Sequence, residues 1–211
     1  MKKTTMLVIT IALSGASLLA QQAKLAPPVP AVTRFEAPMQ AAPDALVKIF
    51  SNLGPASAAY VASGYYVAGP VSALGQSQFM GLPFTPAKNS TAQQLRAAIS
   101  WNATGANRVR LSLYSDAGGV PGTLLAGPVT KANLPAFGTC CTIVTATIPA
   151  TALTAGTQYW IVADTVATGT GSDSEDVWNS APQWIAADVA GGGWFNFVDN
   201  NPAGAVYGTI P

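Results

Sequence analysis

Few side chains in this 211-residue chain are suited to catalysis or metal binding. The sequence has no histidine, and Glu36 and Glu175 are its two glutamates. The lack of histidine excludes Ser-His-Asp and Cys-His nucleophile systems and the common zinc sites. A glycosidase needs two carboxylates held across a cleft, and most of the aspartates lie in turn-like contexts, where they usually stabilise a turn. The residue types therefore predict a protein that is not an enzyme, with a hydrolase as a remote alternative.

The densest group of carboxylates lies in residues 171–176. Asp173, Glu175 and Asp176 could bind calcium through carboxylate and backbone carbonyl oxygens. Their spacing does not match the common calcium loop, which requires an internal glycine and a terminal glutamate. A solvated, flexible loop is the alternative interpretation. Calcium is thus the one candidate cofactor, and these three residues are its candidate ligands.

The two cysteines, Cys140 and Cys141, are neighbours in the chain. Consecutive Cα atoms lie about 3.8 Å apart, so a disulfide between them would close a very small ring. Such a bond adds little stability through chain entropy and would instead stiffen the start of the strand expected at Thr142–Ile148. We predict this disulfide for an oxidising compartment. Two free thiols or a bond between chains are the alternatives, because no further ligand completes a metal site.

Aromatic residues gather late in the chain. Exposed tryptophan rings can stack on sugar rings, and the candidates for ligand binding are Trp178, Trp184 and Trp194. Burial in a hydrophobic core is the alternative for each of them. Trp184 lies between polar and aliphatic neighbours and Trp194 follows three glycines, so these two are the better candidates for exposure.

The elements that would position these residues are strands. Gln94–Trp101, Arg108–Tyr114 and Thr142–Ile148 alternate between inward and outward side chains. A turn with three glycines and a proline, Asp116–Gly122, joins the second of them to Thr123–Val129. Short strands at a spacing of roughly 8–12 residues predict an all-β fold. We expect an antiparallel β-sandwich, jelly-roll-like, with about ten strands, over residues 46–211.

The N-terminal 45 residues have a different composition. Lys2 and Lys3 precede an apolar run, Met6–Leu19, that is short for a membrane span. Residues 1–20 are therefore predicted to be a signal peptide, with cleavage after Ala20 or, alternatively, after Ala16 or Ala23. An uncleaved anchor is the other interpretation. Residues 21–45 are rich in proline and alanine and are expected to form a disordered linker. The mature protein is then secreted or extracellular, in the periplasm or on the cell surface, without a transmembrane segment.

Charged residues are scarce, at 9% of the chain against roughly 25% in an average soluble domain. Removing Lys2 and Lys3 leaves eight basic and nine acidic residues, a net charge of −1. There is no basic stripe, so nucleic acid is not an expected partner. A weakly charged surface rich in Thr, Ser, Asn and Gln suits adhesion or self-association.

Turn and core motifs carry a resemblance to a known family. They are the segment Leu111–Asp116, Gly119, Pro121-Gly122 and Leu125, then Ala155-Gly156-Thr157 with Tyr159-Trp160, and the earlier Gln78-Phe79 and Phe84-Thr85-Pro86. With these motifs, residues 47–211 resemble the choice-of-anchor R domain family. Its members are bacterial exported proteins that share a β-rich domain and differ in the C-terminal signal that attaches them to the cell.

The resemblance implies export and a role at the cell surface, and it supplies no catalytic residues. The last residues, Tyr207–Pro211, contain no hydrophobic tail or sorting motif, so a free secreted form is expected. We predict an exported, non-catalytic extracellular or cell-surface protein with a structural or adhesive role. The alternative is a carbohydrate- or ligand-binding module that uses exposed tryptophan. Glycans or other surface and matrix proteins are the expected partners.

Overall fold

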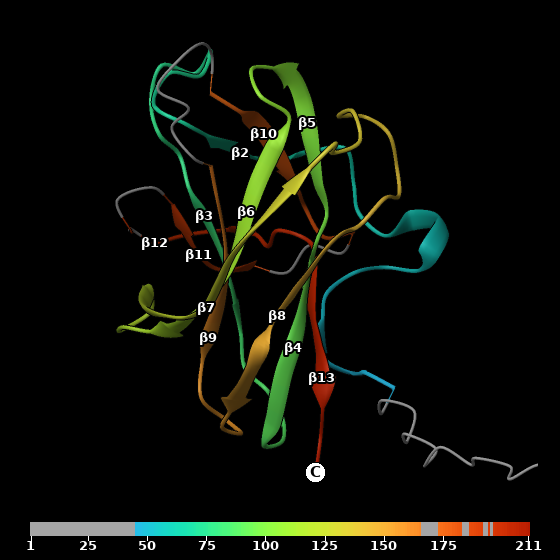
Figure 1. The fold of residues 1–211 in the computed structure, drawn as a ribbon, viewed down its shortest axis with the longest axis vertical. Helices are drawn as coiled ribbons and strands as arrows, with labels where there is room; N and C mark the ends of the chain where they lie inside the picture. Colours follow the sequence, from blue (N-terminus) through green and yellow to red (C-terminus); the bar gives the residue numbers. More distant parts are fainter. Residues whose placement is uncertain (1–44, 166–172, 183–185, 192–193, 195) are drawn as a thin grey trace, which may run out of the picture. The chain divides into compact units, whose positions relative to one another are not determined.

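The computed structural model describes residues 45–165, 173–182, 186–191, 194 and 196–211. The predicted signal peptide and all of the predicted linker except Ala45 lie outside the described residues. Apart from one short 3-10 helix, η1, the described regular structure is β-strand (Figure 1). No helix among the described residues is long and apolar enough to cross a membrane. The elements are β1 (Val47–Ser51), η1 (Ala56–Ala58), β2 (Gly64–Ala68), β3 (Met80–Phe84), β4 (Ser90–Ala97), β5 (Ile99–Thr104), β6 (Arg108–Asp116), β7 (Pro121–Ala132), β8 (Val144–Leu153), β9 (Tyr159–Asp164), β10 (Glu175–Asn179), β11 (Ala186–Gly191), β12 (Asn196–Asn200) and β13 (Gly204–Thr209).

The strands form three antiparallel sheets, in the orders β1-β13-β4-β8, β2-β10-β5 and β12-β11-β3-β9-β6-β7. Eight of these strands make a jelly roll. When β1, β3, β4, β6, β7, β8, β9 and β13 are renumbered 1 to 8, the first sheet has the order 1-8-3-6 and the inner part of the third has the order 2-7-4-5. This arrangement confirms the predicted antiparallel sandwich. The structure has more strands than expected because β11 and β12 extend the third sheet and β2, β10 and β5 form a small sheet of their own.

The main core lies between the first sheet and the β3-β9-β6-β7 part of the third. Alternate residues of each strand point inward, as Leu95 and Ala97 do in β4 and Leu111 and Leu113 do in β6, and all four are fully buried. Burial of each large apolar side chain contributes about 1.5–3 kcal/mol relative to exposure. The period-two pattern visible in the sequence therefore corresponds to the core of the sandwich.

The predicted strand Gln94–Trp101 is divided at Ala98, where the chain passes from one sheet to another. Up to Ala97 it pairs with β13 and β8, and from Ile99 it pairs with β10. The buried side chain of Asn179 stabilises this change of partner, since its Nδ2 donates to the carbonyl of Ala98 at 2.8 Å and to the Ser100 hydroxyl at 2.9 Å. The small β2-β10-β5 sheet then covers one end of the sandwich, at the top of Figure 1.

The turn between β6 and β7 is organised by Asp116. Its carboxylate accepts hydrogen bonds from the backbone N–H groups of Gly118 and Gly119, at 3.0 and 3.1 Å. Both glycines have positive φ, 74° and 90°, which a side chain would disfavour. The same carboxylate accepts from the Trp160 indole at 2.8 Å and from Gln158 at 2.9 Å. The conspicuous turn motif is thus a structural device that joins the hairpin to β9.

Candidate ligand-binding site

The predicted ligand-binding tryptophans do not form a shared platform in the part of the chain that the structure describes. Trp178 is 0% exposed and belongs to the main core, and its Nε1 donates to the carbonyl of Ala203 at 2.8 Å. The prediction that Trp178 binds ligand is therefore wrong, because a ring inside the core offers no face to a ligand. Trp194 is half-buried and packs against Trp160 and Val162. Trp184 lies outside the described residues.

Residues 173–176 are buried and do not form the solvated loop that was the alternative to a calcium site. Asp173 accepts a hydrogen bond from the Val71 N–H at 2.8 Å, and Glu175 accepts one from Asn102 Nδ2 at 2.6 Å. The Ser174 hydroxyl donates to Asp176 at 2.7 Å. Because Glu175 and Asp176 are consecutive in β10, their side chains point to opposite faces. The predicted calcium site is not assembled by these three residues, and no group of three or more His, Cys, Asp or Glu side chains suited to a metal occurs in the described segments.

Asp176 remains the most unusual carboxyl of this segment. The pKa of Asp176 is raised to about 7, mainly by burial; the hydrogen bond from Ser174 lowers it and the nearby charge of Glu175 raises it. The Oδ1 atom of Asp176 has no hydrogen-bond partner. This side chain lines none of the pockets described below, so we treat it as a determinant of stability rather than of binding.

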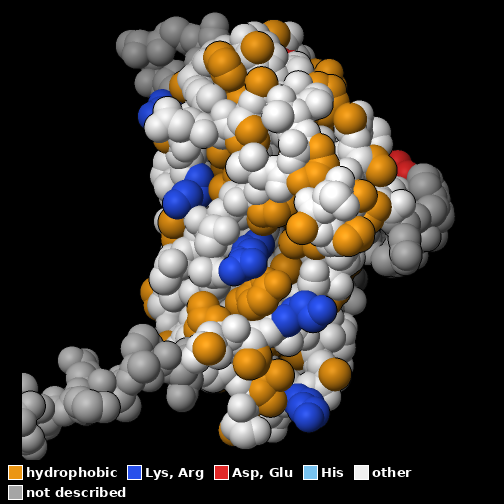
Figure 2. All heavy atoms as spheres, turned by 90° about the vertical axis from the view of Figure 1, so that its right-hand side faces the viewer, with side chains coloured by type: hydrophobic (Ala, Val, Ile, Leu, Met, Phe, Trp, Pro, Cys, Tyr) orange, Lys and Arg blue, Asp and Glu red, His pale blue; other side chains and the backbone are white. Residues whose placement is uncertain are grey.

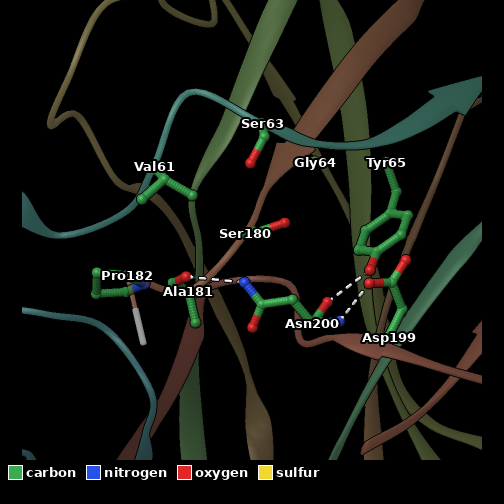
Figure 3. A pocket seen from close by; sticks show the side chains of 9 residues that line it. All are labelled: Val61, Ser63, Gly64, Tyr65, Ser180, Ala181, Pro182, Asp199 and Asn200. Atoms are coloured by element: carbon green, nitrogen blue, oxygen red, sulfur yellow. Dashed lines mark hydrogen bonds between the residues drawn. The ribbon is translucent and has the colours of Figure 1, made fainter. Parts of the chain in front are cut away.

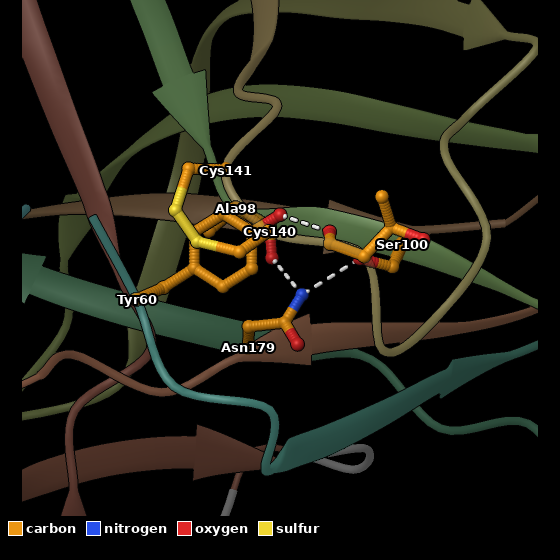
Figure 4. The surroundings of a disulfide bond; sticks show 7 residues. Tyr60, Ala98, Ser100, Cys140, Cys141 and Asn179 are labelled. Atoms are coloured by element: carbon orange, nitrogen blue, oxygen red, sulfur yellow. Dashed lines mark hydrogen bonds between the residues drawn. A yellow bond between two sulfur atoms is a disulfide. The ribbon is translucent and has the colours of Figure 1, made fainter. Parts of the chain in front are cut away.

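The structure joins Cys140 and Cys141 by a disulfide, as predicted (Figure 4). Cys140 is exposed and Cys141 is half-buried. The segment is held in place by Tyr60, whose hydroxyl donates to the carbonyl of Thr139 at 2.8 Å. Cys141 and Ile143 pack against a second, smaller core of Ala59, Tyr60, Ala98, Ala181 and Ala203. The disulfide thus lies at the surface beside this small core, in the segment that precedes β8.

A polar pocket of about 540 Å³ opens at the end of the sandwich (Figure 3). Three parts of the chain meet there: the start of β2 with the residues before it, the residues that follow β10, and the end of β12. The lining residues are Val61, Ser63, Gly64, Tyr65, Ser180, Ala181, Pro182, Asp199 and Asn200. The lining combines hydroxyl, amide and carboxylate groups with the apolar side chains of valine, alanine and proline.

Hydrogen bonds fix the polar side of this pocket. The Tyr65 hydroxyl donates to the carbonyl of Asn200 at 2.6 Å, and Asn200 Nδ2 donates to the carbonyl of Ala181 at 3.1 Å. Burial raises the pKa of Tyr65, and the charge of Asp199 and a hydrogen bond with it raise the pKa further. The phenol therefore stays protonated and acts as a donor, while the Asp199 carboxylate acts as an acceptor.

Two further hollows continue from the polar pocket. The middle hollow, of about 510 Å³, shares Pro182 with the polar pocket and is otherwise lined by Phe50–Pro55 and Ala58. A third hollow of about 360 Å³, here called the cationic pocket, shares Ser51, Leu53 and Gly54 with the middle one. The remaining residues of the cationic pocket are Lys48, Ala56, Ala59, Arg96, Cys141, Ile143 and Tyr207. The three hollows are therefore neighbours that share lining residues.

The loop that separates these hollows is held tightly. Asn52 Nδ2 donates to the carbonyl of Pro202 at 2.8 Å, and Asn52 Oδ1 accepts from the Gly204 N–H at 2.7 Å. A Cβ on Gly54 would lie 2.3 Å from the carbonyl oxygen of Ala58, so only glycine fits there. Residues 54–55 and 199–202 are of types common in turns, and nothing in their composition indicates that they line pockets.

Comparisons with protein-family models, with curated proteins and with solved structures found no match. The resemblance to the choice-of-anchor R family therefore remains a prediction from the sequence.

Proposed function

We propose that this protein is a non-catalytic adhesion protein that acts outside the cytoplasm and holds a hydroxyl-rich ligand, a neutral glycan, in the polar pocket. The observation that carries this proposal is the convergence of the Tyr65 phenol, the Asp199 carboxylate and the Ser180 side chain around one space. Sugar hydroxyls both donate and accept hydrogen bonds, so they suit the acceptor oxygens of Tyr65 and Asp199 beside the Ser180 hydroxyl, which can donate and accept. The volume also suits one or two sugar rings.

The arrangement of groups favours binding over hydrolysis. Asp199 is the one carboxylate that lines the polar pocket as described, whereas glycoside hydrolysis requires a pair of carboxyl groups on either side of the bond. The buried Asp176 lies elsewhere, on β10. The lining residues can form hydrogen bonds with a ligand, but they include no second carboxyl group that could act with Asp199 as an acid–base pair.

Edge strands of the sheets contain features that hinder strand pairing between copies of the protein. They therefore favour adhesion through a pocket over self-assembly. The edge strand β7 contains Pro121 and Pro128, and the edge strand β8 contains Pro149. Proline lacks a backbone N–H and therefore hinders the addition of a further strand. The edge strand β1 is only five residues long and carries Lys48 and a bulge, which acts in the same direction.

A glycan array tests this proposal. The wild-type chain should bind a subset of neutral glycans, and Asp199→Asn should weaken that binding on the order of tenfold, since one charge-assisted hydrogen bond is lost. Asp164→Asn is the matched control because Asp164 pairs with Arg110 on β6, away from the pocket residues. No bound neutral glycan, or equal losses in both variants, would contradict the proposal.

A further inference from the structure

Unlike the polar pocket, the cationic pocket lies on the face of a β-sheet. Its floor is the outward face of the first sheet, where Lys48 of β1 lies opposite Tyr207 of β13, and Tyr207 lies opposite Gln94 of β4. One wall is the loop through Leu53 and Ala56, and the other is the segment of Cys141 and Ile143. The pocket is therefore framed by three strands and two walls, both of which pack on the small core around Tyr60.

Two cations line this pocket and no carboxylate does. The lining contains Lys48 and Arg96 but neither Asp nor Glu. In the described part of the chain the single ion pair joins Arg110 to Asp164, so neither cation of the pocket pairs with a carboxylate of the described residues. Figure 2 views the side on which β13 and η1 lie in Figure 1, and it shows lysine and arginine side chains among hydrophobic ones, with acidic side chains only at the margin.

The guanidinium of Arg96 is held in position while most of its donors stay available. Its Nε donates to Gln94 Oε1 at 2.8 Å, and its Cζ lies 4.1 Å from the centroid of the Tyr207 ring. Stacking on an aromatic ring and one hydrogen bond fix the plane of the group. Arginine has five N–H donors, so the four on the terminal nitrogens can bind a carboxylate in the bidentate manner typical of this side chain.

The rest of the lining is mostly apolar. Leu53, Ala56, Ala59 and Ile143 contribute aliphatic surface, and Cys141 contributes half of the disulfide. An inorganic anion would gain nothing from such walls, whereas an organic acid would bury its apolar body against them. The Ser51 hydroxyl, which accepts from the Leu53 N–H at 3.1 Å, also lines the pocket and adds a polar group.

We propose that the cationic pocket is a binding site for a small organic carboxylate with an apolar body. The carboxylate group lies between Lys48 and Arg96, and the body lies against Leu53, Ile143 and the Cys140–Cys141 disulfide. This site is separate from the polar pocket and does not depend on the function proposed for it. A pocket of about 360 Å³ is of the size that takes a ligand such as an aromatic or short aliphatic acid.

Calorimetric titration of the full chain with benzoate, phenylacetate and hexanoate tests the proposal, with the corresponding neutral amides and sulfate as comparison ligands. At least one acid should bind saturably with a dissociation constant on the order of 1 mM or below. Its amide and sulfate should bind about tenfold more weakly or not at all, because the amide lacks the negative charge and sulfate lacks the apolar body. Binding of the acid should also weaken as salt concentration rises.

Variants locate the site. Arg96→Gln and Lys48→Gln should each weaken binding of the acid about tenfold, and Lys131→Gln on β7, a cation outside the lining residues, should leave it unchanged. Circular dichroism checks that every variant is folded. The proposal is overturned if none of the three acids saturates the protein, if acid and amide bind equally, if sulfate binds as well as the acids, or if the Lys131 variant loses as much affinity as the other two.

Discussion

The indole Nε1 of Trp160 donates a hydrogen bond to Oδ1 of Asp116 at 2.8 Å, and this bond links the two most conspicuous motifs of the sequence. Asp116 ends β6 and organises the following turn, while Trp160 lies fully buried in β9, the strand paired with β6. The motifs around Leu111–Asp116 and Tyr159-Trp160, which carry the family resemblance, are therefore parts of one structural unit. A signature of this kind reports the fold and not an activity.

Replacing Asp116 should be costly for stability. Asp116→Ala removes the acceptor for the buried Trp160 indole and for the Gly118 and Gly119 N–H groups. We expect the free energy of unfolding to fall by about 2–4 kcal/mol, measured by urea denaturation. Asp116→Asn keeps one carbonyl acceptor and should lose about half as much. A loss below about 0.5 kcal/mol in the alanine variant would show that the bond does not stabilise the hairpin.

Stability should depend on pH through Asp176. The pKa of this carboxyl is about 7 in the folded chain, where burial is the main cause, against an ordinary value of 3.8. Between these values the folded state binds more protons than the unfolded state, so the contribution of Asp176 is fully present below about pH 4 and is lost as the pH rises through about 7. The difference corresponds to a loss on the order of 4 kcal/mol.

The variant Asp176→Asn isolates this effect, because an amide does not titrate. Thermal or urea unfolding at several pH values should find the variant more stable than the wild type above about pH 7. Glu175→Gln, one residue earlier in β10, is the comparison variant: it removes the smaller effect of the Glu175 charge on the pKa of Asp176 and should keep most of the wild-type decline. If wild type and Asp176→Asn show parallel pH profiles, Asp176 does not hold its proton in the folded protein.

The disulfide should act locally. Its closed loop is minimal, so changing both Cys140 and Cys141 to Ser should lower the free energy of unfolding by less than about 1 kcal/mol. The amides of Gly138, Thr139 and Ile143 should nevertheless exchange faster with deuterium, since the bond stiffens this wall of the cationic pocket. Intact-mass measurement with and without reductant establishes the bond itself. Two alkylatable thiols in unreduced exported protein, or a dimer that separates on reduction, would contradict the intramolecular bond.

Strands with a clear period-two pattern could be predicted from the sequence. Arg108–Tyr114 corresponds to β6 because every second side chain enters the core, and core burial is a local consequence of alternation. The division of Gln94–Trp101 could not be predicted. It depends on the side chain of Asn179, which is 81 residues away and binds the carbonyl of Ala98. No local pattern marks a residue whose role is set by a distant partner.

The same limit explains why neither the calcium site nor its alternative, a solvated loop, describes residues 173–176. Charged residues near glycine usually lie in solvent, but Asp173 is 102 residues from its donor Val71, and Glu175 is 73 residues from Asn102. The cationic pocket is a further example, because four separate segments contribute its lining: residues 48–59, Arg96, residues 141–143 and Tyr207. They meet only because the jelly-roll connections bring them together.

Export is tested at the N-terminus of the mature chain. If residues 1–20 are a signal peptide, the protein recovered from the medium or the cell surface should begin at Gln21. Cleavage after Ala16 or Ala23 would still support export. N-terminal sequencing of the recovered protein distinguishes these cases. An intact Met1 on protein that stays in the cytoplasm would contradict the proposed location.

The central claim, that the polar pocket binds a neutral glycan, is tested most directly by mapping amide chemical-shift changes when the best glycan from the array is titrated into the isotope-labelled protein. The account predicts that the changes concentrate at Ser63, Gly64, Tyr65, Ser180 and Asn200, which line the pocket, and that Asp199→Asn needs on the order of tenfold more glycan to reach them. Changes concentrated instead around Tyr114 and Trp194 on the outer face of the third sheet, or changes that persist unaltered in Asp199→Asn, would contradict it.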